Sequence, residues 1–516
     1  MAEALCASQK QITLQSLCEG ILPLPDGWDF PVSSLTMDSR KVKSGSVFLA
    51  VAGQKTCAEH YVPHALSQGA ACVLVDCIRS EIGKKNRGDS PVIEVVGLHA
   101  LLGQLFSRFY GTEKMSIPVV GVTGTNGKTS VTYFVASLLQ ALQHVPQGVM
   151  GTTGVGVLGD MVPSSHTTPD VEQVHRLLGE IGRKAGSISM EVSSHALEQN
   201  RVAGVRFSGA VFTNLTRDHL DYHPSMEAYA QAKLKLLAIP FLKWVVVNVD
   251  DKVGQNWVSS HITAERIIRY GVSKEKADLV AERLTYSGIG ISGYICWQKQ
   301  SLPFSVALYG EFNVYNLLAA VGVLIGLGYP LENIVDALGS LPGVPGRMER
   351  ITPLNEGNVP VVLVDYAHTP DALEKALWAM KAHQNGKLWC VFGCGGNRDA
   401  GKRPLMGAIA AREADFVVVT SDNPRNENPK IIIDDILEGV VSGKEKLSVQ
   451  VDRKQAIEQA IQLAGVNDMI LIAGKGHEDY QEINGVRIPF SDAEIVKQAM
   501  QQRLAVTASA SSGGAL

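Results

Sequence analysis

Cysteine is scarce in this sequence, and export signals are missing from its N-terminus. The chain has 8 cysteines in 516 residues and no CxxC pair, which argues against a disulfide scaffold and favours reduced thiols in a cytoplasmic protein. The N-terminal segment MAEALCASQKQITLQ has no basic stretch followed by an apolar run. We therefore expect no secretory signal.

Excess charge of one sign and long apolar runs are also missing. The 47 Lys and Arg residues nearly balance the 51 Asp and Glu residues, for a net charge of −4. This excludes the broad positive field that nucleic-acid binders and acidic-membrane binders use. Residues 312–331 carry no charge, but Asn313, Asn316 and Pro330 interrupt them. We expect a buried helix there and no membrane span.

The composition that remains is typical of a soluble globular protein. Hydrophobic residues make up 45% of the chain and charged residues 19%, and this length corresponds to about three domains. Strand-like segments, such as residues 244–248, 361–365 and 388–392, alternate with helix-like segments, which predicts an α/β fold. We expect a small α/β domain, a central domain with a parallel sheet, a doubly wound C-terminal domain and a disordered tail, at residues 1–112, 113–345, 346–504 and 505–516.

A glycine-rich loop follows an apolar strand at the start of the central domain. The segment GVTGTNGKT, residues 121–129, precedes a helical pattern, and backbone amides at such a helix N-terminus bind phosphates. Val122 stands where the common phosphate loop has its first glycine. Lys128 is expected beside the β- and γ-phosphates of ATP, and the Thr129 hydroxyl beside Mg2+. The loop residues assigned to ATP are Thr123, Gly124, Thr125, Asn126, Gly127, Lys128 and Thr129.

Two other motifs point to different chemistry. Residues 154–159 match GxGxxG, but DMVP follows where a dinucleotide site needs a helix. A glycine-rich hairpin is favoured there, and a nicotinamide oxidoreductase is the weaker alternative. His219 and His223 have the i, i+4 spacing of a zinc site, but Pro224 and the lack of a nearby cysteine argue against zinc.

Several motifs together resemble the Mur ligases. They are GTNGKT at 124–129, MEVSSHAL at 190–197, NLTRDHLDYH at 214–223, FNVYN at 312–316, GRMER at 346–350 and DYAHTPD at 365–371. DNPRNENP at 422–429 is similar to the form specific for diaminopimelate. The resemblance implies three domains that bind a UDP-sugar, ATP and an amino acid, in that order.

The resemblance also implies a reaction in peptidoglycan precursor synthesis. A monomeric, ADP-forming ligase would use ATP and Mg2+ to add meso-2,6-diaminopimelate to UDP-N-acetylmuramoyl-L-alanyl-D-glutamate, through an acyl phosphate. Cations must offset the repulsion between carboxylate and phosphate in such a reaction. The resemblance assigns Mg2+ to Glu191 and His219, together with Thr129, and implies that Lys233 is carbamylated. Carbamylation requires a lysine that can lose its proton, which burial promotes.

Further nucleotide residues are implied by the same resemblance. Asn313 and Asn316 would contact adenine, although the pattern alone fits helix capping equally well. Arg347, Asp365 and His368 would complete the ATP site when the domains close.

The two remaining substrates are assigned in the same way. The UDP-sugar residues are Ser39, Arg40, Gln54, Lys55, Thr56, Thr167, Thr168, Ser193, Gln199 and Arg201. The diaminopimelate residues are Arg398, Asp422, Asn423, Pro424, Arg425, Gly474 and Glu478. Diaminopimelate has one more carboxylate than lysine, and the guanidinium of Arg425 fits that group by bidentate pairing. Lysine should then be a poor substrate.

Two other functions stay open at this stage. A folylpolyglutamate synthase would share the glycine loop, but the DNPR and HTTPD segments argue against it. A P-loop ATPase that works as a conformational switch would hydrolyse ATP without ligation. ADP release that depends on the amino acid distinguishes a ligase from such a switch.

Overall fold

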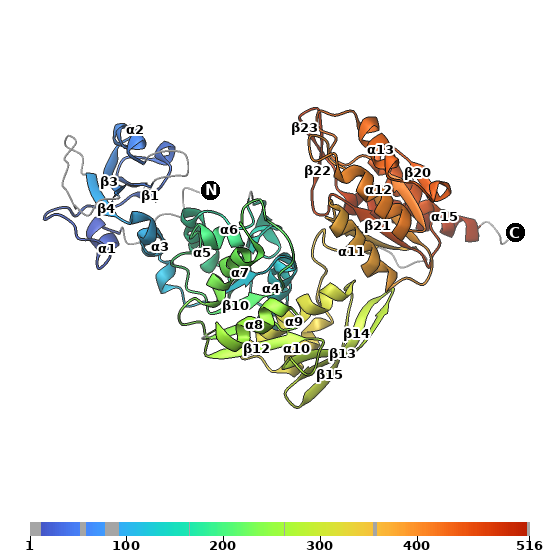
Figure 1. Ribbon diagram of the computed structural model, residues 1–516, viewed down its shortest axis with the longest axis horizontal. Helices are drawn as coiled ribbons and strands as arrows, with labels where there is room; N and C mark the ends of the chain where they lie inside the picture. Colours follow the sequence, from blue (N-terminus) through green and yellow to red (C-terminus); the bar gives the residue numbers. More distant parts are fainter. Residues whose placement is uncertain are drawn as a thin grey trace. The chain divides into compact units, whose positions relative to one another are not determined.

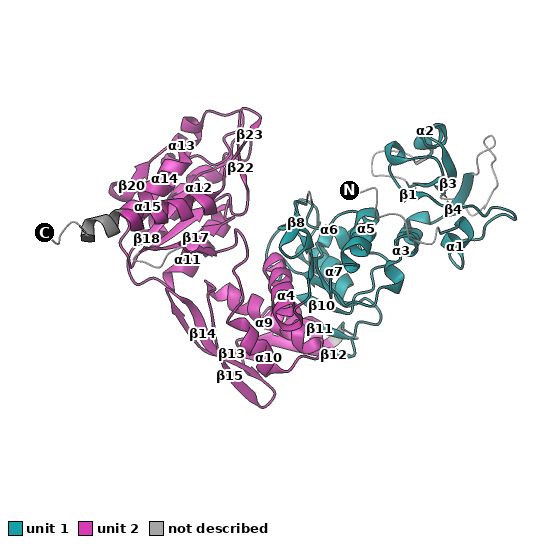
Figure 2. Cartoon of the chain, turned by 180° about the vertical axis from the view of Figure 1, so that it is seen from behind, with its two compact units in different colours: residues 1–125, 145–245, 260–266 teal, residues 126–144, 246–259, 267–516 magenta. Residues whose placement is uncertain are grey.

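The computed structural model of the chain describes residues 12–51, 58–77, 92–164, 166–262, 264–353 and 359–512. The chain divides into two compact units, coloured separately in Figure 2. Unit 1 comprises residues 1–125, 145–245 and 260–266, and unit 2 comprises residues 126–144, 246–259 and 267–516. Both units are α/β structures with parallel strands, as the alternating pattern predicts. The domain boundaries expected at residues 113 and 346 stay a prediction.

Unit 1 begins with a four-stranded parallel sheet in the order β1-β2-β3-β4. Both faces are buried, because Leu49 and Leu74 pack in one core while Phe48 and Val73 pack in another. Burial on both faces explains the continuous apolar strands. The elements are α1 (Leu14–Cys18), β1 (Ser34–Thr36), η1 (Ser39–Lys41), β2 (Ser46–Ala50), η2 (Ala58–Tyr61), α2 (Val62–Ser67), β3 (Ala70–Cys77), β4 (Val92–Val96), α3 (Leu98–Phe109) and η3 (Thr112–Lys114).

Unit 1 continues with strands in the order β10-β5-β9-β6-β7-β8. β5 pairs in parallel with β9 and β10, and β7 pairs antiparallel with β6 and β8. The GxGxxG segment is therefore a hairpin, as predicted, and it opens no helix. The elements are β5 (Val119–Thr123), β6 (Gly148–Gly151), β7 (Gly154–Val157), β8 (Asp160–Val162), α5 (Val171–Gly182), β9 (Ile188–Glu191), α6 (Ser194–Glu198), β10 (Gly209–Phe212) and α7 (Met226–Leu237).

Unit 2 begins with helices and an antiparallel meander. Helix α9 is buried along most of its length, as the uncharged segment predicts. No described helix is both long and apolar enough to cross a membrane. The meander β13-β14-β15 was not among the predicted strands. The elements are α4 (Lys128–Gln143), β13 (Leu279–Ser287), β14 (Gly290–Trp297), β15 (Gln300–Val306), α9 (Glu311–Gly326) and α10 (Leu331–Leu338), while β11 (Trp244–Asn248), α8 (Lys252–Ser260) and β12 (Arg266–Gly271) cross the division between the units.

The C-terminal part of unit 2 is built on a six-stranded sheet, β16-β17-β21-β18-β19-β20, seen with its helices in Figure 1. Alternate residues of β17 enter different cores, because Leu363 packs with α11–α13 and Val364 packs with α14 and α15. This two-sided covering is the predicted doubly wound arrangement. The elements are β16 (Glu349–Ile351), β17 (Val361–Asp365), α11 (Pro370–Lys381), β18 (Leu388–Phe392), α12 (Lys402–Glu413), β19 (Phe416–Val419), α13 (Pro429–Glu438), η4 (Lys444–Lys446), β20 (Leu447–Val449), α14 (Arg453–Leu463), β21 (Met469–Ala473), β22 (Tyr480–Ile483), β23 (Val486–Pro489) and α15 (Asp492–Ser512).

The disordered tail expected at residues 505–516 stays a prediction. Helix α15 runs to Ser512, and residues 513–516 lie outside the described residues.

Candidate functional site

The glycine loop has the predicted strand–loop–helix context. β5 ends at Thr123, and α4 begins at Lys128. The residue between loop and helix is Gly127, which has a left-handed φ of 85° and provides no side-chain cap. Gly124 has φ 147°, and a Cβ there would lie 1.8 Å from Thr213 Oγ1. The first turn of α4 therefore presents backbone amides beyond a loop that requires glycine, as a phosphate site needs.

Thr125 joins this loop to the segment after β10. Its backbone N–H donates to the Asn214 carbonyl at 2.8 Å, and its hydroxyl accepts from the Thr216 N–H at 3.0 Å. The same hydroxyl lies 3.3 Å from the Tyr229 hydroxyl on α7. The two strand ends that carry the GTNGKT and NLTRDHLDYH motifs are thus held together.

Glu191 is the last residue of β9 and is 1% exposed. Its Oε1 accepts the Thr152 N–H at 2.7 Å, and a Cβ at Gly151 would lie 2.2 Å from that oxygen. Its backbone carbonyl accepts the Thr168 hydroxyl at 2.9 Å. A buried carboxylate at the carboxyl end of a parallel strand lies where α/β proteins form their ligand sites.

The predicted UDP-sugar residues of the middle region form one bonded set around Thr168. The Thr168 hydroxyl accepts the Ser193 N–H at 3.1 Å, and its carbonyl accepts Arg201 Nη1 at 2.8 Å. Arg201 Nε and Nη2 both donate to Gln199 Oε1, at 2.9 and 2.6 Å. Thr167 lies beside the set, where its hydroxyl accepts from Thr152 Oγ1 at 3.4 Å.

The N-terminal UDP-sugar residues are only partly described. Ser39 is 7% exposed, and Arg40 makes a two-point ion pair with Asp38, at 2.9 Å for each contact. Gln54, Lys55 and Thr56 lie outside the described residues. Arg40 is held by its own neighbour, which orients the guanidinium before any ligand arrives.

Glu172 connects that N-terminal segment to the middle region. Its Oε2 accepts from the Thr36 hydroxyl at 3.0 Å and from the Met37 N–H at 3.1 Å. Burial raises the pKa of this carboxyl. Sequence reasoning missed Glu172, because nothing in TPDVE separates a linking carboxylate from an exposed one.

Aromatic and histidine rings surround the predicted metal ligand His219. Its ring centroid lies 5.0 Å from that of His195 and 5.9 Å from that of Tyr229. His219 has φ 52°, and its side chain is 44% exposed. Among the described residues, no group of three or more His, Cys, Asp or Glu side chains is arranged to hold a metal ion.

Lys233 on α7 is buried, at 1% exposure, whereas Lys235 is a surface residue that pairs with Glu198 at 2.9 Å. The Lys233 Nζ donates to the Gly124 carbonyl at 2.8 Å and lies 4.3 Å from the centroid of the Tyr229 ring. Burial disfavours the charged ammonium. The lysine that the resemblance selects is therefore the buried one of the two.

The two asparagines at the start of α9 are buried and bonded to each other. Asn316 Nδ2 donates to Asn313 Oδ1 at 3.0 Å, and Asn313 Nδ2 donates to the Tyr309 carbonyl at 2.8 Å. Gly310 occupies the N-cap position. The capping alternative is therefore wrong for both asparagines.

Arg347, Asp365 and His368 lie together at the end of β17. Asp365 accepts the Met348 N–H at 2.7 Å, and burial raises its pKa although Arg347 opposes the shift. The Arg347 guanidinium lies 5.0 Å from the centroid of the Tyr366 ring, and His368 Nδ1 lies 2.9 Å from the Tyr366 carbonyl. The structure thus brings all three predicted residues to one strand end.

The predicted amino-acid residues meet at the ends of β19 and β21. Asn423 Nδ2 donates to Glu478 Oε2 at 2.9 Å. A Cβ at Gly474 would lie 2.6 Å from Asp422 Oδ2, and burial raises the pKa of Asp422. A side chain at residue 474 would therefore displace the carboxylate, which explains the glycine there.

Arg425 is held at the edge of the same group. It has φ 52°, its N–H donates to the Glu482 carbonyl at 2.9 Å, and its Nη1 donates to the Gly396 carbonyl at 2.8 Å. A Cβ at Gly396 would lie 1.9 Å from the Pro424 carbonyl oxygen. Arg398 is exposed on the loop that carries Gly396. Both predicted arginines therefore belong to this strand-end region.

Sequence reasoning missed three buried cations beside this region. Arg453 forms a buried ion pair with Asp492 at 2.7 Å, and Arg403 pairs with Glu427 at 2.9 Å. Lys475 is fully buried and contacts three of the predicted pocket residues, Asp422, Asn423 and Glu478. Lys475 stands in GKGHE, which could have marked it, whereas no motif surrounds Arg403 or Arg453, and burial of a cation leaves no local pattern.

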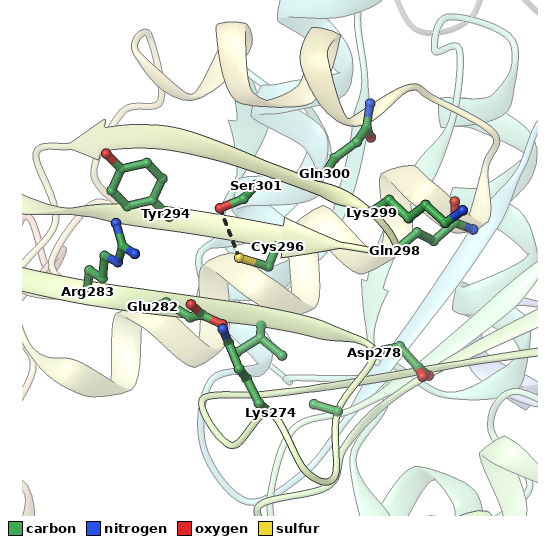
Figure 3. Close-up of a pocket in the computed structure, with 12 residues that line it drawn as sticks. Lys274, Asp278, Glu282, Arg283, Tyr294, Cys296, Gln298, Lys299, Gln300 and Ser301 are labelled. Carbon is green, nitrogen blue, oxygen red and sulfur yellow. Dashed lines mark hydrogen bonds and ion pairs between the residues drawn. The ribbon is translucent and has the colours of Figure 1, made fainter.

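A surface pocket of 440 Å³ lies on the meander and is drawn in Figure 3. Two of its charged residues, Lys274 and Glu282, pair with each other at 2.5 Å, and Asp278 pairs with Arg269 outside the pocket. Cys296 lies on its wall, with Sγ 3.3 Å from Ser301 Oγ. None of the sequence-predicted site residues lines it.

Comparison with known proteins gives consistent matches along the chain. Three family models match: the Mur ligase family catalytic domain at residues 31–110, the Mur ligase middle domain at 122–324 and the Mur ligase glutamate ligase domain at 346–476. A Pseudomonas aeruginosa protein named UDP-N-acetylmuramoyl-L-alanyl-D-glutamate–2,6-diaminopimelate ligase is 47% identical over 474 residues, which are 92% of this chain and 96% of the relative.

Solved structures extend the comparison to the fold. A structure of a ligase of that same name aligns with a TM-score of 0.74 and 35% identity, over 96% of this chain and 99% of the other. The Mycobacterium tuberculosis folylpolyglutamate synthase aligns with a TM-score of 0.55 and 17% identity, over 78% of this chain and 94% of the other. The second likeness shows a shared fold alone.

Proposed function

The chain belongs to the Mur ligase family, and we propose that it adds meso-2,6-diaminopimelate to UDP-N-acetylmuramoyl-L-alanyl-D-glutamate, with ATP converted to ADP and phosphate. The identity to ligases of that name over nearly the whole chain supports this activity. One observation supports the choice of amino acid. Arg425 and the carboxylates of Asp422 and Glu478 lie around one strand end, which suits a substrate with a carboxylate and an ammonium at its distal centre.

The reaction has two steps that balance without an outside oxidant or reductant. A carboxylate oxygen of the UDP-linked dipeptide attacks the γ-phosphorus of ATP, the bond to the β-bridging oxygen breaks, and ADP leaves. The amine of diaminopimelate then attacks the acyl carbon, phosphate leaves, and the amine nitrogen loses a proton. We assign Lys128 to the β- and γ-phosphates and the amides of the first turn of α4 to phosphate binding.

We assign Mg2+ to Glu191, His219 and Thr129. Mg2+ would neutralise phosphate charge, which a carboxylate at a strand end suits because Mg2+ prefers oxygen ligands. The Glu191 carboxylate fits this role, because it accepts hydrogen bonds from the N–H and the hydroxyl of Thr152. Both donors are neutral, so they do not offset its negative charge. Lys233 would assist after reaction of its neutral amine with CO2, and its burial favours that amine.

The remaining predicted residues bind the substrates in this proposal. Asn313, Asn316, Arg347, Asp365 and His368 bind the nucleotide, and Ser39, Arg40, Gln54, Lys55, Thr56, Thr167, Thr168, Ser193, Gln199 and Arg201 bind the UDP-sugar. Arg398, Asp422, Asn423, Pro424, Arg425, Gly474 and Glu478 bind diaminopimelate. The enzyme would act as a monomer in the cytoplasm, and the free thiols among the described cysteines agree with a reducing compartment.

The test is ADP release with ATP, Mg2+ and UDP-N-acetylmuramoyl-L-alanyl-D-glutamate. Parallel reactions contain meso-diaminopimelate, L-lysine or no amine. We expect release only with diaminopimelate. Release with lysine would keep the ligase activity and remove the selectivity argument for Arg425, whereas equal release in all three reactions would favour the ATPase switch.

A further inference from the structure

Lys475 is a buried cation in the loop after β21. It is 0% exposed and lies between Gly474 and Gly476, which both have positive φ. An ammonium removed from water is unfavourable unless other groups pair with it. Its surroundings must therefore supply that compensation.

The compensating groups are three residues assigned above to diaminopimelate. Lys475 Nζ donates to Asn423 Oδ1 at 3.1 Å and to Glu478 Oε2 at 3.2 Å, and it lies 3.8 Å from Asp422 Oδ1. Asn423 Nδ2 also donates to Glu478 Oε2, at 2.9 Å. The lysine, the amide and the Glu478 carboxylate therefore form a closed triangle of hydrogen bonds.

These bonds fix how Asn423 and Glu478 are oriented. Asn423 Oδ1 accepts from Lys475 and from the Glu482 N–H at 2.9 Å, so its amide nitrogen faces Glu478. The Glu478 side chain is 21% exposed, whereas that of Lys475 is 0% exposed. A ligand can reach Glu478 but not the lysine behind it.

We propose that Lys475 is a positioning residue for the incoming amino acid: it holds Asn423 and Glu478 in the orientation that binds the substrate ammonium. This inference rests on the proposed function. Two carboxylates around one lysine carry a net charge of −1, which complements an ammonium. Without the lysine, the two carboxylates repel each other, and Asn423 Oδ1 keeps only the Glu482 N–H of its two donors.

The test compares Lys475→Met with Lys497→Met, an exposed lysine of α15 that pairs with Glu494 at 2.8 Å. We expect Lys475→Met to raise the KM for diaminopimelate about tenfold, the usual size of a lost hydrogen bond to a charged group. The KM values for ATP and for the UDP-linked dipeptide should stay the same. Lys497→Met should match the wild type.

A second readout separates positioning from a general structural defect. Isotope exchange within γ-labelled ATP, with the UDP-linked dipeptide and no amine, reports acyl-phosphate formation alone. We expect Lys475→Met to keep the wild-type exchange rate. An unchanged KM for diaminopimelate would overturn the inference. A lower exchange rate together with a rise in all three KM values would also overturn it.

Lys475→Arg covers the case in which the methionine variant does not fold. It keeps the charge but moves the donors, so we expect a KM for diaminopimelate between that of the wild type and tenfold above it. A wild-type KM in this variant would also overturn the inference. Wild-type enzyme that releases no ADP with diaminopimelate would contradict the proposed function itself, which is a separate outcome.

Discussion

Two strand ends of the molecule hold their carboxylates in opposite ways. At the end of β9, Glu191 accepts hydrogen bonds from the backbone and hydroxyl of Thr152, which are neutral groups. At the ends of β19 and β21, the carboxylates of Asp422 and Glu478 face the ammonium of Lys475. Neutral donors leave the negative charge of Glu191 uncompensated, which suits a metal cation. The buried lysine offsets one of two negative charges, and the net charge of −1 that remains suits the ammonium of an amino acid.

The arginines of the two regions show the same division. The Arg201 guanidinium donates hydrogen bonds to Gln199 Oε1 and to the Thr168 carbonyl, which are neutral acceptors. Arg425 donates to the Gly396 carbonyl and lies 3.6 Å from Glu482 Oε2. Both guanidinium groups are oriented before a ligand binds, which reduces the entropy lost on binding.

The largest expected effect is that of Glu191→Gln. This change keeps the side-chain shape and the bond from Thr152 but removes the negative charge. We expect kcat to fall about 10³-fold, because removal of one electrostatic group in a buried site has effects of that order. The Mg2+ concentration for half-maximal activity should also rise.

Glu180→Gln on α5 is the matched control, because its side chain is 47% exposed and pairs only at the surface with Arg176. Wild-type kcat in Glu191→Gln, measured over a Mg2+ titration, would show that the charge at the end of β9 has no role.

A smaller effect is expected for Arg425→Ala. Loss of the guanidinium should lower kcat/KM for diaminopimelate about 100-fold and reduce discrimination against lysine, since the extra carboxylate loses its partner. Steady-state kinetics with each amine measures both changes. The control is Arg412→Ala, whose side chain is 55% exposed on α12. Undiminished discrimination would remove Arg425 from the site.

The smallest effect is expected for Arg201→Ala. We expect the KM for the UDP-linked dipeptide to rise about tenfold, because a charge-assisted contact is lost, while the KM for diaminopimelate stays the same. Arg176→Ala on the exposed face of α5 is the control. If the KM for diaminopimelate rose instead, the two strand ends would not have separate substrates.

The strands were predictable where burial is continuous. Predicted strands at residues 244–248, 361–365 and 388–392 match β11, β17 and β18. These are runs of apolar and β-branched residues, covered on both faces, and their signal is strong. The meander was missed, since strands such as β13 are half exposed and mix polar with apolar residues.

The position of a candidate residue at a strand end was predictable where a motif surrounds that residue. GTNGKT, MEVSSHAL and DNPR each mark a strand end, and the structure brings their residues together within each unit. Lys475, Arg453 and Glu172 could not be found in this way. Each has a partner far along the chain, such as Asn423 for Lys475, Ala473 for Arg453 and Thr36 for Glu172, which are 52, 20 and 136 positions away.

The mass of the UDP-linked product tests the central claim most directly. The wild-type enzyme is incubated with ATP, Mg2+, UDP-N-acetylmuramoyl-L-alanyl-D-glutamate and an equal mixture of meso-diaminopimelate and L-lysine. The account predicts a product heavier than the substrate by diaminopimelate less one water. A product that carries lysine, or a substrate of unchanged mass after ATP is consumed, would contradict it.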